Sequence, residues 1–225
     1  MLDSALSIFV AGRNLARLWE GLEITLWISL ASVGLSIAFG VPFGLVMASG
    51  RRFWPKILRL YLEAVRVVPV LVLLFLFYYT LSSAFSVNLS AYVVSVLVFT
   101  IWGAAEMSDL VRASVTSLPA HQRESGRALG LTGRQVDLYV VVPQAVRRLL
   151  PGVINLTTRM IKTTPFVFFI NIPDLMKVGQ QIVEVAGMRN HLASVWVYGF
   201  IFLVYFAICY PVSLFSRHLE GRWQS

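Results

Sequence analysis

The stretch ITLWISLASVGLSIAFGVPFGLVMASG, residues 24–50, contains no charged side chain. An α-helix needs about 20 mainly apolar residues to cross the hydrocarbon core of a bilayer, so this stretch is long enough for one crossing. Two more charge-free runs are Val67–Ala105 and Leu192–Ser216, and the first is long enough for two crossings on either side of a polar loop near Asn88. The sequence therefore predicts a protein that spans a membrane.

The composition excludes several classes of protein. Hydrophobic residues make up 57% of the 225 residues and charged residues 13%, whereas soluble domains contain about 25% charged residues. A soluble enzyme of this composition could not cover its apolar surface, and a disordered chain needs low hydrophobicity. A nucleic-acid-binding domain would show its basic residues clustered on a polar face, whereas the residues behind the net charge of +8 are not clustered in this way. The single cysteine, Cys209, indicates no compartment.

We expect one all-α transmembrane domain over residues 1–225, with five helices. The five predicted helices cover about residues 22–48, 60–81, 90–112, 148–172 and 193–216. Twelve of the nineteen lysine and arginine residues flank the same side of these helices. Because such residues accumulate on the cytoplasmic side, the N-terminus is predicted outside and the C-terminus in the cytoplasm. Prolines in or beside the predicted helices, such as Pro69 and Pro165, are expected to kink or end them.

The connection over about residues 118–145 is the only sizeable polar segment. Gly130 suits the C-terminal stop of one short helix. Thr132 and Gln135 have the spacing of a capping box at the start of a second helix, which Pro143 is expected to end. These residues predict a helix–turn–helix at the membrane surface. On composition alone, an ordered loop without a partner fits equally well.

The same connection contains a glutamate and two small residues, followed at fixed spacing by a glycine, two aliphatic residues and a proline. The residues are Glu124-Ser125-Gly126, Gly130, Val140, Val142 and Pro143. The spacing resembles the cytoplasmic "EAA" loop of ATP-binding-cassette (ABC) importer permeases, in which Glu-Ala-Ala is followed by Gly, two aliphatic residues and Pro. Ser125 and Gly126 replace the two alanines of the family pattern, which keeps both side chains small.

Three shorter motifs resemble the polar amino-acid uptake branch of that family. Arg66-Val67-Val68-Pro69 resembles the branch's Arg-Gly-Thr-Pro, Ser108-Asp109 with Arg112 resembles its Ala-Glu followed by Arg, and Lys162-Thr163-Thr164-Pro165 resembles its Lys-Asp-Thr-Ser. The resemblance covers most of the chain. It implies the type I ABC importer permease fold, which has five spans and an outside N-terminus in this branch.

The resemblance also implies a function and a set of partners. Permeases of this family import their substrate as homo- or heterodimers in the bacterial cytoplasmic (inner) membrane. They bind two ATPase subunits, which hold ATP and Mg, and receive substrate from an extracytoplasmic binding protein. A coupling helix at about Ala120–Leu129 would dock on the ATPase. The residues assigned to the coupling loop are Glu124, Ser125, Gly126, Arg127, Ala128, Gly130 and Pro143.

No catalytic chemistry is expected in this chain. It contains no Gly-x-x-x-x-Gly-Lys-Ser/Thr stretch, so either an ATPase partner exists or transport is not driven by ATP. Its three histidines are far apart, and no spacing of cysteine and histidine suggests a metal site. We therefore expect no cofactor or metal here, and no nucleic-acid partner. The alternative function is an ATP-independent secondary transporter or channel subunit, which would favour more spans or inverted repeats.

Two pairs of charges within the predicted helices need an explanation, because a charge at mid-bilayer costs at least about 2.5–3.5 kcal/mol. Glu106 and Asp109 share a face of the third helix with Arg112. One interpretation is an Asp109–Arg112 pair, with Glu106 facing polar groups inside the bundle. The other is that Glu106 lines the substrate pathway and meets an amino group.

Arg159 and Lys162 lie three residues apart on the fourth predicted helix. Lys162 matches a lysine of the family and is interpreted mainly as structural. Arg159 could grip a substrate carboxylate with two hydrogen bonds or pair with Glu106. The two acidic residues favour a cationic amino acid, and the two basic ones favour an acidic substrate. The sequence therefore predicts polar amino acids or related compounds such as opines, without choosing among them.

Overall fold

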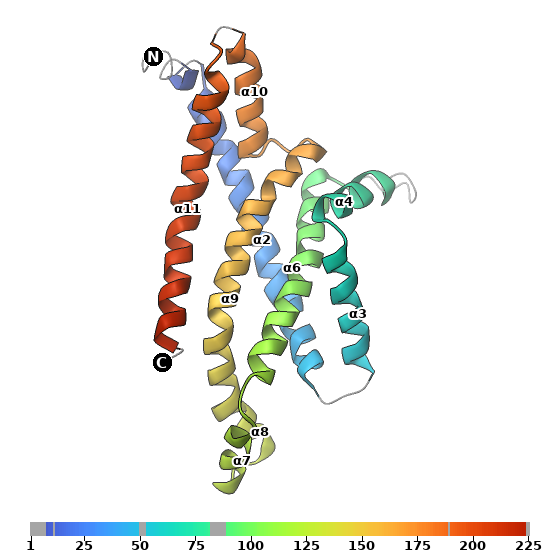
Figure 1. Ribbon diagram of the computed structural model, residues 1–225. Coiled ribbons are helices and arrows are strands. Elements are labelled where there is room, and N and C mark those ends of the chain that lie inside the picture. The colour runs from blue at the N-terminus through green and yellow to red at the C-terminus, as the bar shows by residue number, and fades with distance from the viewer. Residues whose placement is uncertain (1–7, 11, 50–52, 82–88, 189, 224–225) are drawn as a thin grey trace. The chain divides into compact units, whose positions relative to one another are not determined.

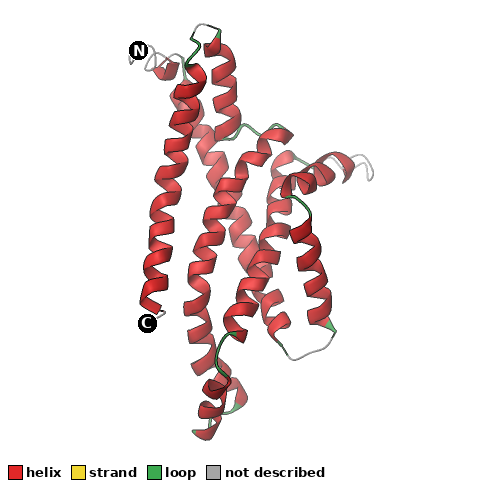
Figure 2. Cartoon of the chain, in the orientation of Figure 1, coloured by secondary structure: helices red, strands yellow, loops and turns green. Residues whose placement is uncertain are grey.

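The computed structural model describes residues 8–10, 12–49, 53–81, 89–188 and 190–223, and these residues form helices and no strand (Figure 2). In chain order (Figure 1) the elements are α2 (Asn14–Ala48), α3 (Trp54–Val67), α4 (Val70–Phe75), π-helical η1 (Leu76–Leu81), α6 (Ala91–Thr116), α7 (Ala120–Ala128), α8 (Gly133–Val136), π-helical η2 (Asp137–Val141), α9 (Val142–Thr163), 3-10 helical η3 (Thr164–Ile170), α10 (Leu175–Gly187) and α11 (Ala193–Trp223). The predicted all-α class is confirmed. Most of the polar loop predicted near Asn88 lies outside the described residues.

Three of the described helices, α2, α6 and α11, are long and apolar enough to cross a membrane. A fourth crossing results if α3 and the segment from Val70 to Thr80 are counted together, although the two are bent by 98°. The fifth predicted crossing corresponds to α9. This helix is long enough, with 22 residues, but it is not among the helices that are apolar enough to cross a membrane. The charges of α9 lower its mean hydropathy.

The bend between α3 and α4 follows from one proline. Val68, the residue before Pro69, has the extended backbone angles φ −84° and ψ 125°. The ring of a proline disfavours the helical conformation in the residue before it, so α3 ends at Val67 and a new helix begins at Val70. The expectation that Pro69 interrupts a helix is confirmed. The segment predicted as one helix over 60–81 is therefore divided between α3 and the helical segment from Val70 to Leu81.

The fourth predicted helix, over 148–172, also differs from the structure. Helix α9 begins earlier, at Val142, and ends at Thr163. A 3-10 segment with Pro165 near its start continues the chain, and Asn171, with φ 63°, ends it. Asp174 then caps α10, because its Oδ1 accepts a hydrogen bond from the backbone N–H of Lys177 at 2.9 Å.

The chain divides into two compact units, with boundaries inside α2, α6, α9 and α11 and between α3 and α4. Unit 1 comprises Met1–Ala31, Val70–Val98 and Arg159–Pro211. Its core is formed mainly by the first turns of α2, by α10 and by the first turns of α11 (Figure 1), through Ile8, Leu18, Leu22, Leu175, Val178, Ile182, Ala193, Val197 and Ile201. A Cβ added at Gly179 of α10 would lie 2.2 Å from Cδ1 of Ile201, so the absence of a side chain allows this close packing.

Unit 2 comprises Ser32–Pro69, Phe99–Thr158 and Val212–Ser225. Within it, α2 lies against α6 through two glycines four residues apart. A Cβ at Gly40 would lie 2.5 Å from Cβ of Met107, and one at Gly44 would lie 2.5 Å from the carbonyl oxygen of Ser108. Small residues at this spacing let two membrane helices approach until their backbones touch. Helix α6 is therefore the centre of this unit.

Candidate functional site

Helix α7, the predicted coupling helix, is shaped by its C-terminal stop. The backbone N–H of Leu131 donates to the carbonyl of Gly126 at 3.2 Å, and that of Gly130 donates to Arg127 at 2.9 Å. These two bonds form a Schellman motif. Gly130 has φ +82°, a conformation that glycine adopts without strain. The predicted stop at Gly130 is confirmed.

The second short helix begins where the sequence predicted and continues farther. Thr132 is the N-cap of α8, and Oε1 of Gln135 accepts a hydrogen bond from the Thr132 backbone N–H at 2.9 Å. Helix α8 then runs through η2 into α9 without a break. The prediction that Pro143 ends this helix is wrong. Proline lacks an N–H, so in a regular α-helix it leaves the carbonyl four residues before it without a hydrogen bond. The π-helical turn just before Pro143 changes the hydrogen-bond spacing there, so the helix continues past the proline.

Three contacts hold α7 against the helix that follows it. Gly126 is buried against Val136, since a Cβ at Gly126 would lie 3.0 Å from Cγ2 of Val136. The Arg123 guanidinium pairs with Asp137 at 2.6 Å, and Gln144 donates from Nε2 to Oε1 of Gln122 at 3.2 Å. The turn is thus one packed body rather than a loose loop.

The remaining residues of the predicted coupling loop point outward. Glu124, Ser125, Arg127, Ala128, Gly130 and Pro143 are exposed. The Leu129 side chain is 83% exposed. A carboxylate, a guanidinium and an apolar side chain therefore share a small rigid surface, which we call the coupling surface (residues 124, 125 and 127–130). Such a mixture of charged rim and apolar anchor suits a protein partner.

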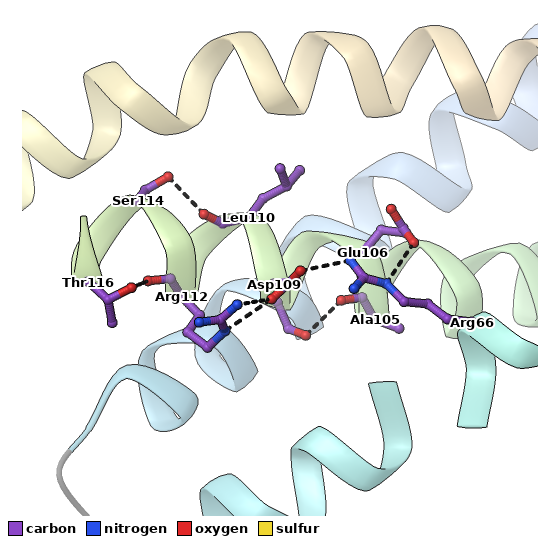
Figure 3. Close-up of polar contacts among 9 residues, drawn as sticks. Arg66, Ala105, Glu106, Asp109, Leu110, Arg112, Ser114 and Thr116 are labelled. Carbon is purple, nitrogen blue, oxygen red and sulfur yellow. Dashed lines mark hydrogen bonds and ion pairs between the residues drawn. The ribbon is translucent and has the colours of Figure 1, made fainter. Parts of the chain in front are cut away.

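The predicted charges of α6 form an ion-pair cluster with α3 (Figure 3). Arg66, near the end of α3, donates from Nε to Oε1 of Glu106 at 3.2 Å and from Nη2 to Oδ2 of Asp109 at 2.8 Å. Nε of Arg112 donates to the other oxygen of Asp109 at 3.0 Å. The expected Asp109–Arg112 pair is therefore present.

The role of Arg66 was missed in the sequence. Arg66 stands 40 residues before Glu106, and nothing local links them. The spacing of Glu106 and Asp109 could have indicated such a partner, because it puts two carboxylates on one face of a predicted membrane helix. Two charges in such a position are expected to pair with a cation from another helix. The cluster borders a cavity of about 330 Å³, lined by Met47, Arg59, Leu62, Glu63, Arg66, Val67, Asp109 and Arg112.

Arg159 and Lys162 are exposed near the end of α9. They belong to unit 1, whereas Glu106 and Asp109 belong to unit 2. The alternative that Arg159 pairs with Glu106 stays a prediction, as does a pathway role for all four residues. Within the part of the chain that the structure describes, no group of three or more His, Cys, Asp or Glu side chains could hold a metal ion.

The chain is similar to several curated permeases. It is 27% identical to the probable glutamine ABC transporter permease protein GlnP of Bacillus subtilis, over 93% of this chain and 94% of that protein. It is 31% identical to the L-cystine transport system permease protein TcyB of the same organism, over 91% of this chain and 87% of that protein. Both alignments include the coupling surface and the charged segment of α6.

Solved structures show the same fold. A crystal structure described as an amino acid ABC transporter with histidines matches with a TM-score of 0.80 and 26% identity, covering 91% of this chain and 94% of that one. An inward-facing structure of the MetNI methionine ABC transporter matches with a TM-score of 0.70 and 17% identity, covering 91% and 97%. At the lower identity the likeness concerns the fold alone.

The sequence model of one family, described as the binding-protein-dependent transport system inner membrane component, matches residues 40–225, which include all of α3, α6 and the coupling surface. Members of this family are the membrane subunits of ABC transporters, and ATP hydrolysis takes place on a separate subunit. The chain belongs to the family of binding-protein-dependent transport system inner membrane components.

Proposed function

We propose that this chain is the permease subunit of an ATP-driven importer for polar amino acids or related compounds. The observation that carries the proposal is the coupling surface, a rigid exposed turn fixed by Gly130 and by the contact of Gly126 with Val136. The relatives named for glutamine and cystine support the substrate class. The subunit would work with a second permease chain, two ATPase subunits holding ATP and Mg, and an extracytoplasmic binding protein.

We further propose five membrane crossings, with the N-terminus outside and the C-terminus in the cytoplasm of a bacterium. The apolar helices α2, α6 and α11 and the bent α3–α4 pair supply four of them. Helix α9, with 22 residues, supplies the fifth, since a helix rises about 1.5 Å per residue and α9 would match the thickness of the hydrocarbon core. Its charges suit a helix that faces other protein segments or water rather than lipid.

The structure suggests how movement of an ATPase would reach the transport pathway. Helix α8, η2 and α9 form one continuous helical path from the turn after Gly130 to Thr163. The Arg123–Asp137 pair ties α7 to the start of that path. A displacement of α7 by the ATPase would therefore be transmitted along α9 to Arg159 and Lys162 without passing through a flexible loop.

Glu106, Asp109, Arg159 and Lys162 are the residues that we propose for the pathway. Arg66 and Arg112 neutralise Glu106 and Asp109, so these carboxylates no longer argue for a cationic substrate. Arg159 and Lys162 suit the α-carboxylate that every free amino acid carries. In this proposal the two basic residues meet the substrate, and the ion-pair cluster shapes the wall of the pathway.

The decisive experiment is co-purification of the ATPase subunit with the tagged chain from a strain that expresses the whole transporter. Arg127→Glu reverses a charge on the coupling surface and should lower the recovered ATPase about tenfold. Arg217→Glu, at an exposed arginine of α11 that is not part of that surface, should leave recovery unchanged. Absence of any ATPase with the unmodified chain would refute the proposal and favour the ATP-independent alternative.

A further inference from the structure

Unit 1 contains a cavity that none of the transport functions above uses. It has a volume of about 540 Å³ and is lined by Glu20, Glu23, Ile24, Trp27 and Tyr92. The first four residues lie on α2, and Tyr92 lies in the first turn of α6. Positions separated by three, four and seven residues share one face of a helix, so Glu20, Glu23 and Trp27 line the same side of α2.

The chemistry of this cavity selects a cation. Two carboxylates stand beside two aromatic rings, and the face of an indole or phenol ring attracts a positive charge. The Glu20 carboxylate is partly compensated by Arg13, at 3.5 Å. Glu23 has no ion pair among the residues that the structure describes. A primary ammonium fits best, because its N–H groups can donate to Glu23 while its charge lies near Trp27.

The position of the cavity along α2 indicates where that cation comes from. Glu23 is the last charged residue before the charge-free run that starts at Ile24. Trp27 is 58% exposed and Tyr92 is 37% exposed. Tryptophan and tyrosine in such positions sit at the level of the lipid headgroups. If α2 crosses the membrane as proposed above, the cavity lies where its apolar segment gives way to water, at the depth of a phospholipid headgroup.

We propose that this cavity, which we call the α2 headgroup site (Glu20, Glu23, Ile24, Trp27 and Tyr92), binds a phospholipid whose headgroup carries a primary ammonium. The ammonium is held by the Glu23 carboxylate and the Trp27 indole, and the acyl chains follow the apolar surface of α2 beyond Ile24. A quaternary headgroup would keep the attraction to the aromatic rings but could not donate a hydrogen bond to Glu23. An anionic headgroup would be repelled.

The test uses the transporter complex containing the full chain, purified in detergent and mixed with phosphatidylethanolamine, phosphatidylcholine or phosphatidylglycerol of identical acyl chains. Native mass spectrometry counts the lipids retained. We expect phosphatidylethanolamine to be retained about tenfold more strongly than phosphatidylglycerol, with phosphatidylcholine between them. Equal retention of the ethanolamine and glycerol lipids would overturn the proposal.

Matched variants locate the site. Glu23→Gln and Trp27→Leu should each remove the preference for phosphatidylethanolamine. Glu184→Gln, at an exposed carboxylate of α10 in the same unit, and Phe39→Leu, at an exposed aromatic residue in the second half of α2, should retain it. If Glu23→Gln leaves lipid retention unchanged but weakens binding of the extracytoplasmic binding protein, the face serves a basic protein partner and the lipid proposal is wrong. None of these readouts depends on transport.

Discussion

The segment formed by α7, α8 and the turn between them (residues 120–136), which we call the coupling segment, and the surroundings of α6 are stabilised in opposite ways. In the coupling segment, the deciding bonds join residues a few positions apart, as between Leu131 and Gly126 or Thr132 and Gln135. Around α6, the deciding contacts join residues 40 or more positions apart, as between Arg66 and Glu106. The first region can form as soon as its own residues are present, whereas the second requires three helices to assemble. Whole-chain stability and ATPase binding, measured separately, should therefore respond differently to substitutions in the two regions.

The largest expected effect comes from the α2–α6 contact. Gly44→Val would place a Cβ 2.5 Å from the carbonyl oxygen of Ser108, and backbone atoms cannot yield as a flexible side chain can. We expect a loss of about 3 kcal/mol in the free energy of unfolding, measured in detergent. Gly34→Val, also on α2 but with open space around the glycine, is the control. Equal stability of the two variants would mean that the helices can separate at no cost.

The ion-pair cluster should give the next largest effect. Arg66→Met leaves Glu106 and Asp109, whose side chains are 14% and 22% exposed, without their shared cation. We expect a loss of about 2 kcal/mol, reduced from the cost of a fully buried pair because Arg66 itself is partly exposed. Arg59→Met changes an arginine that lines the same cavity and should cost much less. A double-mutant cycle with Glu106→Gln measures the coupling directly.

A smaller and more local effect is expected in the coupling segment. Gly130→Val forces a β-branched residue into a backbone with φ +82° and should cost about 1–2 kcal/mol. Because the strain is confined to the turn, less ATPase should co-purify with the variant, while the melting temperature of the protein should change little. Gly133→Val, at a nearby glycine with negative φ and open space, is the matched control. A drop in global stability without loss of ATPase binding would contradict the local nature of this segment.

The smallest effect concerns Asp174, which combines both kinds of contact. Burial raises the pKa of Asp174 to about 6, against the lowering influence of backbone N–H groups such as that of Lys177. The folded protein therefore holds this proton more tightly than the unfolded chain, and stability falls as the pH rises between about 4 and 6 and just above. We expect Asp174 to contribute a loss of about 1 kcal/mol between pH 5 and 7.

Asp174→Asn is the matching variant, because asparagine also caps helices but carries no titrating proton. Its melting temperature should lack that part of the pH dependence. The same slope in both proteins would assign the effect to another group.

Features whose signals are close together in the chain could be predicted from the sequence. The stop at Gly130, the cap at Thr132 and the Asp109–Arg112 pair all depend on residues within five positions of one another. Features decided by tertiary contacts or by proline geometry could not. The sequence does not show whether Pro69 bends a helix slightly or turns the chain by 98°, and the pairing of Arg66 with Glu106 depends on how α3 lies on α6.

Pro143 shows the same limit at short range. A proline near a helix end usually stops the helix, yet here the chain continues from α8 into α9. The π-helical turn η2 accommodates the missing N–H, and single-sequence rules contain no strong signal for such turns. The predicted coupling residues therefore lie at a short turn, as the sequence indicated, but that turn is joined to the next helix by a longer continuous helix than expected.

The π-helical turn η2 also fixes the direction in which the side chains of α9 point. A π-helical turn contains one residue more than an α-helical turn, and each residue of an α-helix turns the chain by about 100°. The side chains of α9 therefore point about 100° away from where they would point if α8 continued into α9 as a regular α-helix. Removing one residue within Asp137–Val141 would turn the whole following helix, including the positions of Arg159 and Lys162. Asp137–Val141 is mostly exposed, and exposed segments usually tolerate insertions and deletions. In this segment they should be tolerated far less, because each would rotate α9.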